Sequence, residues 1–165
     1  MTTVITANRA GVTTFGTSSA REVVMTRVVE ARRRHVFEAW TNPEHLPHWL
    51  LGPDGWTMPV CEIDLRPGGA WRCVWRDRAG AGMEMHGVYR EITPPGRVVY
   101  TESPVDDSRE ALSTLVLSEQ DGKTSIMCTM LFPSKEARDA ALRTGMQEGV
   151  SASFDRLSAY LRTKA

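Results

Sequence analysis

The sequence predicts an α+β fold, in which a curved antiparallel sheet wraps around a long C-terminal helix and two short helices follow the first strand. Two observations predict it. Six consecutive strand-length segments are separated by turn signals without a helical segment between them, whereas parallel strands would need helical crossovers. Residues 135–162 lack proline and carry an apolar repeat with helical spacing.

The composition is that of one ordinary domain with a hydrophobic core. The chain has 165 residues, of which 41% are hydrophobic and 24% are charged. Twenty Lys and Arg balance twenty Asp and Glu, so no net charge attracts nucleic acid or an anionic membrane. No apolar run approaches the ~20 residues of a membrane span, and the N-terminus lacks a leader pattern. We therefore expect a cytoplasmic protein that binds neither nucleic acid nor membrane.

The cysteines and histidines do not indicate a metal or a disulfide framework. Cys61, Cys73 and Cys128 are an odd number without zinc-ligand spacing, and each lies in a strand-like segment where Cys acts as a small apolar residue. His45 and His48 have i, i+3 spacing but no third candidate ligand beside them. We expect reduced thiols, no metal site and no cofactor.

Residues 1–20 are rich in Thr, Ala, Gly and Ser, which predicts an N-terminal arm before a single domain at 21–165. If the arm packs in a fixed position, it lies along a sheet edge or on a second subunit. A homodimer is therefore one expectation. The β-branched run at 22–31 predicts the first strand. A helix follows at 32–42, and a second short helix, interrupted by Pro47, at 43–50.

The strand series is separated by RPGG, RAGAG, TPPG and the hairpin signal Asp121-Gly122. Alternation places Trp71 and Cys73 on the face toward the long helix and Arg72 on the opposite face. In the next strand, Met85 and Gly87 share the less charged face, where they would leave deformable space. The six strands are expected at 56–65, 70–77, 83–92, 97–103, 111–119 and 123–132.

The C-terminal helix begins after Ser134, which is a good N-cap residue. Gly145, Gly149 and Ser153 have i, i+4, i+8 spacing and form a line of small residues beside the apolar stripe. This line indicates close packing, a local helix break or room for a ligand, and the sequence leaves these alternatives open. The apolar stripe itself comprises Ala141, Leu142, Met146, Val150, Phe154, Leu157 and Leu161.

Five separated motifs resemble one known family. In chain order they are VFEAWTNPEHLPHWL, CEIDLRPGGAWRCVWR, GVYREITPPGRVVYTE, DGKTSIMCTMLFPSKEARDA and GMQEGVSASFDRLSAYL. Together they closely resemble bacterial members of the family named after the activator of the heat-shock protein 90 ATPase, within the SRPBCC, or START-like, superfamily. The likeness covers residues 22–163. It implies a helix-grip fold, in which the sheet grips the C-terminal helix around a hydrophobic cavity.

The resemblance extends to individual positions and also shows departures. Relatives usually carry proline where this chain has Arg32, and Trp where it has Leu50 and often where it has Val150. The last two changes place smaller groups near the expected cavity, so the relatives' ligand preference does not carry over. The eukaryotic name-giver has a further chaperone-contacting domain that nothing here matches, so the likeness does not by itself imply chaperone activation. The matching motif positions are Phe37, Ala39, Trp40, Trp49, Asp64, Arg66, Gly68, Gly69, Gly149, Leu157 and Leu161.

The leading functional hypothesis is a binding protein for a small, mainly hydrophobic molecule held between the sheet and the C-terminal helix. One alternative is a cyclase, hydratase or lyase that uses Glu84 or His86 as acid or base, although no catalytic motif is recognisable and we assign no catalytic residue. Another is a chaperone-associated or regulatory interaction protein. The expected ligand-binding residues are Trp40, Trp49, Trp71, Met85, Met146, Val150 and Phe154.

Overall fold

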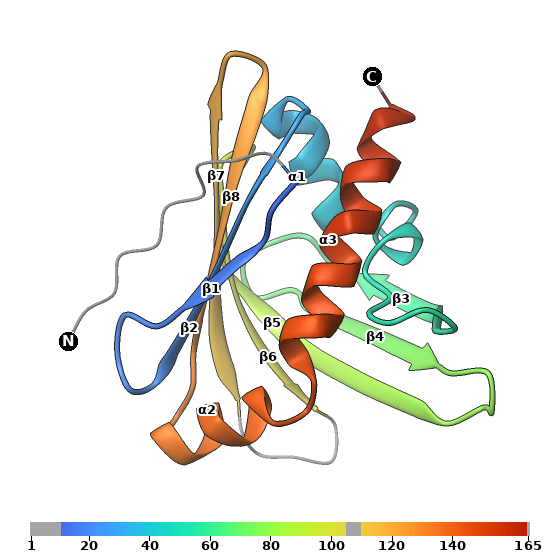
Figure 1. The fold of residues 1–165 in the computed structure, drawn as a ribbon, viewed down its shortest axis with the longest axis vertical. Helices are drawn as coiled ribbons and strands as arrows, with labels where there is room; N and C mark the ends of the chain where they lie inside the picture. Colours follow the sequence, from blue (N-terminus) through green and yellow to red (C-terminus); the bar gives the residue numbers. More distant parts are fainter. Residues whose placement is uncertain (1–10, 105–109, 165) are drawn as a thin grey trace.

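The computed structural model describes residues 11–104 and 110–164 (Figure 1). Two strands precede the two short helices, where the sequence predicts one, and the six predicted strands follow them. The bounds are β1 Thr14–Gly16, β2 Glu22–Val29, α1 Arg33–Thr41, the 3-10 helix η1 Leu46–His48, β3 Thr57–Ile63, β4 Ala70–Arg76, β5 Gly82–Thr93, β6 Arg97–Pro104, β7 Ala111–Gln120, β8 Lys123–Leu131, α2 Lys135–Leu142 and α3 Met146–Arg162.

The strands form a single antiparallel sheet in the order β1-β2-β8-β7-β6-β5-β4-β3. The sheet bends strongly, so that β2, β7 and β8 stand upright in Figure 1 while β4 and β5 run beneath α3. This confirms the predicted α+β fold with a curved sheet around a C-terminal helix. An additional strand, β1, lies within the range expected as an arm and pairs with β2 at the sheet edge. Residues 1–10 of that range lie outside the described residues.

The prediction of one continuous C-terminal helix is wrong. Two helices, α2 and α3, are separated at Gly145, whose φ of 82° lies in the left-handed region. Glycine adopts this conformation without the steric cost that a Cβ imposes, so the chain turns here. The predicted N-cap is confirmed, because the Ser134 hydroxyl accepts a hydrogen bond from the Ala137 backbone N–H at 3.0 Å.

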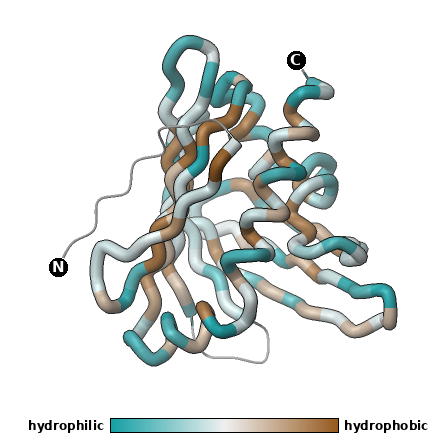
Figure 2. The backbone as a smooth tube through the Cα atoms, in the orientation of Figure 1, coloured by the Kyte–Doolittle hydropathy of each residue, from teal (hydrophilic) through white to brown (hydrophobic). Residues whose placement is uncertain are grey.

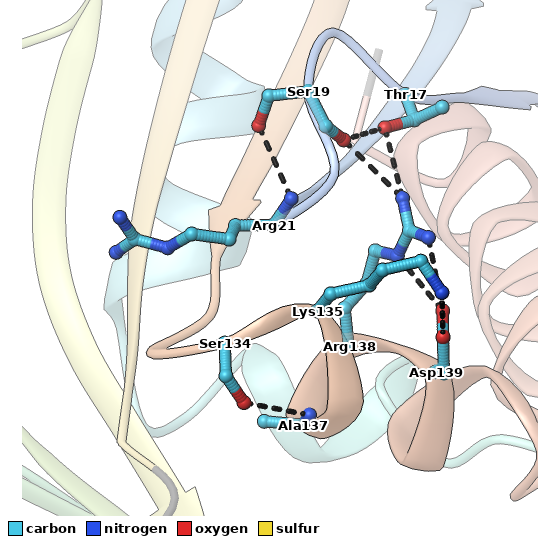
Figure 3. Close-up of polar contacts among 8 residues, drawn as sticks. All are labelled: Thr17, Ser19, Arg21, Ser134, Lys135, Ala137, Arg138 and Asp139. Atoms are coloured by element: carbon cyan, nitrogen blue, oxygen red, sulfur yellow. Dashed lines mark hydrogen bonds and ion pairs between the residues drawn. The ribbon is translucent and has the colours of Figure 1, made fainter.

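Polar contacts attach α2 to the β1–β2 turn (Figure 3). The Arg138 guanidinium donates to the Thr17 hydroxyl and to the Ser19 carbonyl, each at 3.2 Å. Arg138 also pairs with Asp139, which binds Lys135 at 2.7 Å. These contacts hold the sheet edge and the C-terminal part of the chain together.

The core lies between the inward, concave face of the sheet and the helices α1 and α3. Figure 2 shows hydrophobic residues along the strands and hydrophilic residues at the tip of the β7–β8 hairpin. None of the described helices combines the length and apolar character that a membrane crossing needs. The largest fully buried side chains include Trp49, Leu115, Leu117, Ile126 and Leu157.

Candidate functional site

Three of the predicted binding residues form one aromatic cluster, which we call the packed cluster: Trp40 from α1, Trp49 after η1, and Phe154 from α3. The ring centroids of Trp40 lie 4.8 Å from Trp49 and 5.7 Å from Phe154. Trp49 is fully buried, and its indole N–H donates to the Ala39 carbonyl at 2.9 Å. Phe154 is also buried, whereas Trp40 is half-buried. Trp49 and Phe154 therefore act as core residues.

A second aromatic cluster, which we call the open cluster, lies on the inward face of β4, β5 and β6 and comprises Trp71, Tyr89 and Tyr100. The centroid of Tyr100 lies 6.1 Å from Trp71 and 6.3 Å from Tyr89. The Trp71 indole N–H donates to the Thr101 carbonyl at 3.0 Å. Tyr89 is buried, but Trp71 and Tyr100 are only half-buried.

The other three predicted residues, Met85, Met146 and Val150, are half-buried against the core. Met85 lies on β5 and pairs with Pro104 of β6, while Met146 and Val150 lie on α3. The seven predicted residues therefore do not line a single binding site together. Trp49 and Phe154 lie within the core, whereas the others retain accessible surface.

Gly87 does not provide the deformable space expected from the sequence. A Cβ at this position would lie 1.7 Å from the Thr101 carbonyl oxygen and 2.6 Å from Trp71 Nε1. Gly87 is therefore needed for close approach of the backbone and the Trp71 indole, and that indole occupies the space.

The line of small residues on α3 packs against a loop. Gly52 donates its backbone N–H to the Ser153 hydroxyl at 2.8 Å, and a Cβ at Gly149 would lie in ordinary contact with Pro53, at 3.8 Å. Gly145 produces the helix break. Of the alternatives left open by the spacing, loop packing and the break are the ones observed, and no room for a ligand is needed to explain these residues.

Glu102, an acidic residue on the inward face of β6, is not among the site residues predicted from the sequence. It shares that face with Val98 and Tyr100 by strand alternation, and it pairs with Ala111 of β7. Burial raises the pKa of its carboxyl group to about 7, while the Ser113 hydroxyl acts in the opposite direction. None of the ion pairs among the described residues involves Glu102.

The surroundings of Glu102 are poorly screened by water. Burial raises the pKa of the Tyr100 hydroxyl and of the Cys128 thiol, and the negative charge of Glu102 raises both further. The Ser113 hydroxyl oxygen is buried without a partner at hydrogen-bond geometry. Glu102 and Ser113 thus place two polar groups in an otherwise apolar and aromatic environment.

One signal for Glu102 was present in the sequence. Alternation in RVVYTESP puts Glu102 on the same face as Val98 and Tyr100. The opposite face of this strand carries Val99 and Thr101 and looks equally apolar, so the alternation alone did not identify the inward face.

The acid–base candidates of the enzyme hypothesis lie on the outer face of the sheet. Arg72 binds Glu84 at 3.0 Å and Glu62 at 3.1 Å, and these are cross-strand pairs of opposite charge on one face of the sheet. The Arg72 guanidinium lowers the pKa of the Glu84 carboxyl group. His86 is exposed. Neither residue faces the space toward α3.

His45 and His48 both contact one tyrosine of α3. His45 Nδ1 lies 2.6 Å from the Tyr160 hydroxyl, and the His48 ring stacks on the Tyr160 ring with a centroid separation of 5.1 Å. Within the described ranges there is no group of three side chains suited to hold a metal ion. These contacts give both histidines a structural role in attaching η1 to α3.

The three cysteines are free thiols. The sequence placed them on separate strands but did not bring any two together. In the structure Cys61 and Cys73 are register partners on β3 and β4, and their sulfur atoms are 4.0 Å apart. Cys73 and Cys128 are buried.

Two open pockets lie away from the predicted binding residues. One, of about 450 Å³, lies between β2 and α3, where the buried Arg27 donates to Asp155 at 2.7 Å and to Ser158 at 3.0 Å. The other, of about 420 Å³, is on the outer face of the sheet beside Val99 and Leu112. None of the seven predicted residues lines either pocket.

Comparisons with known proteins agree with this architecture. A crystal structure of a protein from Rhodobacter sphaeroides is 28% identical, with a TM-score of 0.86, and the match covers 92% of this chain and 98% of that one. A protein from Nitrosomonas europaea is 22% identical, with a TM-score of 0.80 and coverage of 88% and 97%. An NMR structure of an AHSA1-like protein from Aeromonas hydrophila is 20% identical, with a TM-score of 0.66 and coverage of 86% and 93%.

The search among curated proteins found no match. The comparison with family models matches residues 30–162 to the family described as Activator of Hsp90 ATPase homolog 1-like protein. The chain therefore belongs to the Activator of Hsp90 ATPase homolog 1-like family and has its helix-grip fold.

Proposed function

We propose that the protein is a cytoplasmic binding protein for a small, mainly hydrophobic molecule, held between α3 and the inward face of β4–β6. One observation carries the proposal. Burial removes enough hydration from Tyr100 and Glu102 to raise the pKa of each, yet both side chains retain accessible surface. A side chain that is surrounded by protein and still retains accessible surface faces a hollow. On the outer surface of the protein, such a group would stay hydrated and keep its ordinary pKa.

The same region supplies apolar surface for a ligand. Trp71 and Met85 of the sheet, and Met146 and Val150 of α3, are half-buried although they face inward. Burying such apolar surface against a ligand contributes a favourable free energy of about 25 cal/mol per Å², before the costs of association are subtracted. Methionine and aromatic side chains adapt to apolar ligands of different shape, which supports a binding role.

Native mass spectrometry of the freshly purified protein and titration with n-octanol, followed by tryptophan fluorescence, test the proposal. We expect a retained small molecule or saturable octanol binding. Val150→Trp should weaken octanol binding at least tenfold, because an indole on α3 fills the space beside the open cluster. The matched control Leu112→Trp adds the same indole to the exposed outer face and should leave binding unchanged.

Circular dichroism of both variants verifies that they are folded. The proposal is wrong if the wild-type protein carries no molecule and does not bind octanol saturably. It is also wrong if a folded Val150→Trp variant binds octanol as tightly as the wild type.

A further inference from the structure

Glu102 is an unusual group for the wall of an apolar binding site. On the inward face, the residues beside it on the two neighbouring strands are among the smallest. Ala111 is its register partner on β7, and Gly87 lies on β5 between the pairs His86–Ser103 and Tyr89–Tyr100. Neither neighbour can cover the carboxyl group, which is why it keeps accessible surface in a buried environment.

Among the residues that the structure describes, the groups identified around the carboxyl are aromatic or neutral. The Trp71 indole lies over Gly87, because a Cβ added at Gly87 would lie 2.6 Å from Trp71 Nε1. Tyr100 precedes Glu102 by two residues on the same face, and its ring contacts both Trp71 and Tyr89. The ring faces of Trp and Tyr attract cations through their quadrupole.

A second polar group, the Ser113 hydroxyl, lies beside the Glu102 carboxyl group. Ser113 on β7 is the register partner of Tyr100, and it is 4% exposed. Its buried hydroxyl has no hydrogen-bond partner among the described residues. The hydroxyl lies near enough to the Glu102 carboxyl group to lower its pKa, but not at hydrogen-bond geometry, so it can also bond a ligand group held beside that carboxyl.

We propose that Glu102, together with the Ser113 hydroxyl and the open cluster, forms a recognition site for the ammonium group of an otherwise apolar ligand. The inference rests on the proposed function, because the apolar part of the ligand occupies the same hollow. A buried carboxylate without a cationic partner gains a charge-assisted hydrogen bond from an ammonium group, and Trp71 and Tyr100 add cation–π attraction. An alcohol of the same length gains neither interaction in full, and a carboxylic acid anion is repelled.

Three probes with one apolar body and different charge test this: n-octylammonium, n-octanol and octanoate, each titrated at pH 8 and followed by calorimetry. We expect the wild type to bind octylammonium about tenfold more tightly than octanol, and octanoate most weakly. Glu102→Gln should abolish the preference for octylammonium while retaining octanol binding. Glu84→Gln, which removes the same charge from the outer face, should keep the preference.

The pH dependence gives a second readout. Octylammonium, like a Lys side chain, has a pKa of about 10.4 and stays charged from pH 6 to pH 8. The preference should therefore decrease several-fold toward pH 6, as Glu102 takes up a proton. The other titratable groups on the inward face of β4, β5, β6 and β8 in the described chain are Cys73, Tyr89, Tyr100 and Cys128. The raised pKa of each keeps it neutral throughout this range.

The outcomes separate the two proposals. If octanol binds and octylammonium shows no advantage, or if the advantage persists in Glu102→Gln, the ammonium site is wrong and the hydrophobic site stands. If none of the three probes binds to the folded wild type, the hydrophobic site is wrong and the ammonium site with it.

Discussion

The packed cluster and the open cluster each contain three aromatic rings at similar separations, but they differ in what surrounds them. In the packed cluster, α1, the segment after η1, and α3 supply one ring each, and Trp49 is fully buried. In the open cluster all three rings come from neighbouring strands of one sheet, and two of them stay half-buried. Complete burial of a large ring thus needs elements that approach from different sides.

The polar groups near the two clusters differ in the same way. Beside the packed cluster, the buried Ser153 hydroxyl has a partner in the Gly52 backbone N–H. Beside the open cluster, the Ser113 hydroxyl has none, and Glu102 has no ion-pair partner among the described residues. A fully packed region satisfies its polar groups internally, whereas unsatisfied groups indicate a place where another molecule belongs.

The largest contrast should appear when one tryptophan of each cluster is removed. Trp49→Ala should lower the free energy of unfolding by about 3–5 kcal/mol, because it leaves a cavity in a closed core. Trp71→Ala should cost roughly 1–2 kcal/mol, since its ring is already half-exposed. Urea unfolding followed by circular dichroism measures both, and equal losses would show that the open cluster is as tightly packed as the core.

A smaller contrast concerns the pH dependence of stability. The Glu102 carboxyl has a pKa of about 7 in the folded protein and an ordinary value of 4.5, so the folded state holds the proton more tightly. The contribution of this group to stability is therefore lost as the pH rises from about 4.5 through about 7. We expect Glu102→Gln to be more stable than the wild type by about 1–3 kcal/mol at pH 8, with the difference shrinking toward pH 5.

Glu84→Gln is the control for that experiment. Arg72 lowers the pKa of Glu84 on the outer face, so the sign is reversed: its contribution is present at neutral pH and lost as the pH falls below the ordinary value. We expect this variant to be slightly less stable than the wild type at pH 8, because solvent screens an exposed ion pair. A Glu102→Gln variant that shows the same sign as Glu84→Gln would contradict the burial of Glu102 in an apolar hollow.

The smallest contrast involves the two buried serines. Ser153→Ala should cost about 1–2 kcal/mol, because it leaves the Gly52 N–H without an acceptor. Ser113→Ala should change stability by less than about 0.5 kcal/mol, because no hydrogen bond at good geometry is lost. Thermal unfolding of the two variants measures the difference, and a larger loss for Ser113→Ala would reveal a partner for its hydroxyl within the protein.

Much of the fold was predictable because its signals are local. The alternation around Trp71 and Cys73 correctly identified the inward face of β4, since Arg72 between them and Arg76 farther along the strand mark the outer face. Ser134 marked the start of α2 for a similar reason, because an N-cap depends on the next three residues. Signals that extend over a few residues can be evaluated without knowledge of distant contacts.

The candidate site was predicted only in part. The aromatic residues were identified because large apolar side chains are rare, but burial of Trp49 depends on Phe154, which lies far from it in the sequence. Glu102 was missed because both faces of its strand carry similar residues. Gly87 was misinterpreted because its neighbours Trp71 and Thr101 come from other strands.

By itself the sequence determined the strands from β2 to β8, the two short helices, and which side chains share a strand face, because periodicity and capping act along the chain. Only the tertiary structure decided that α3 begins after a left-handed Gly145, that the Gly52 loop covers Ser153, and that Glu102, which has no ion-pair partner among the described residues, lies in a buried environment. Each of these depends on which distant segments meet in space, and it is those meetings that set burial, hydration and pKa.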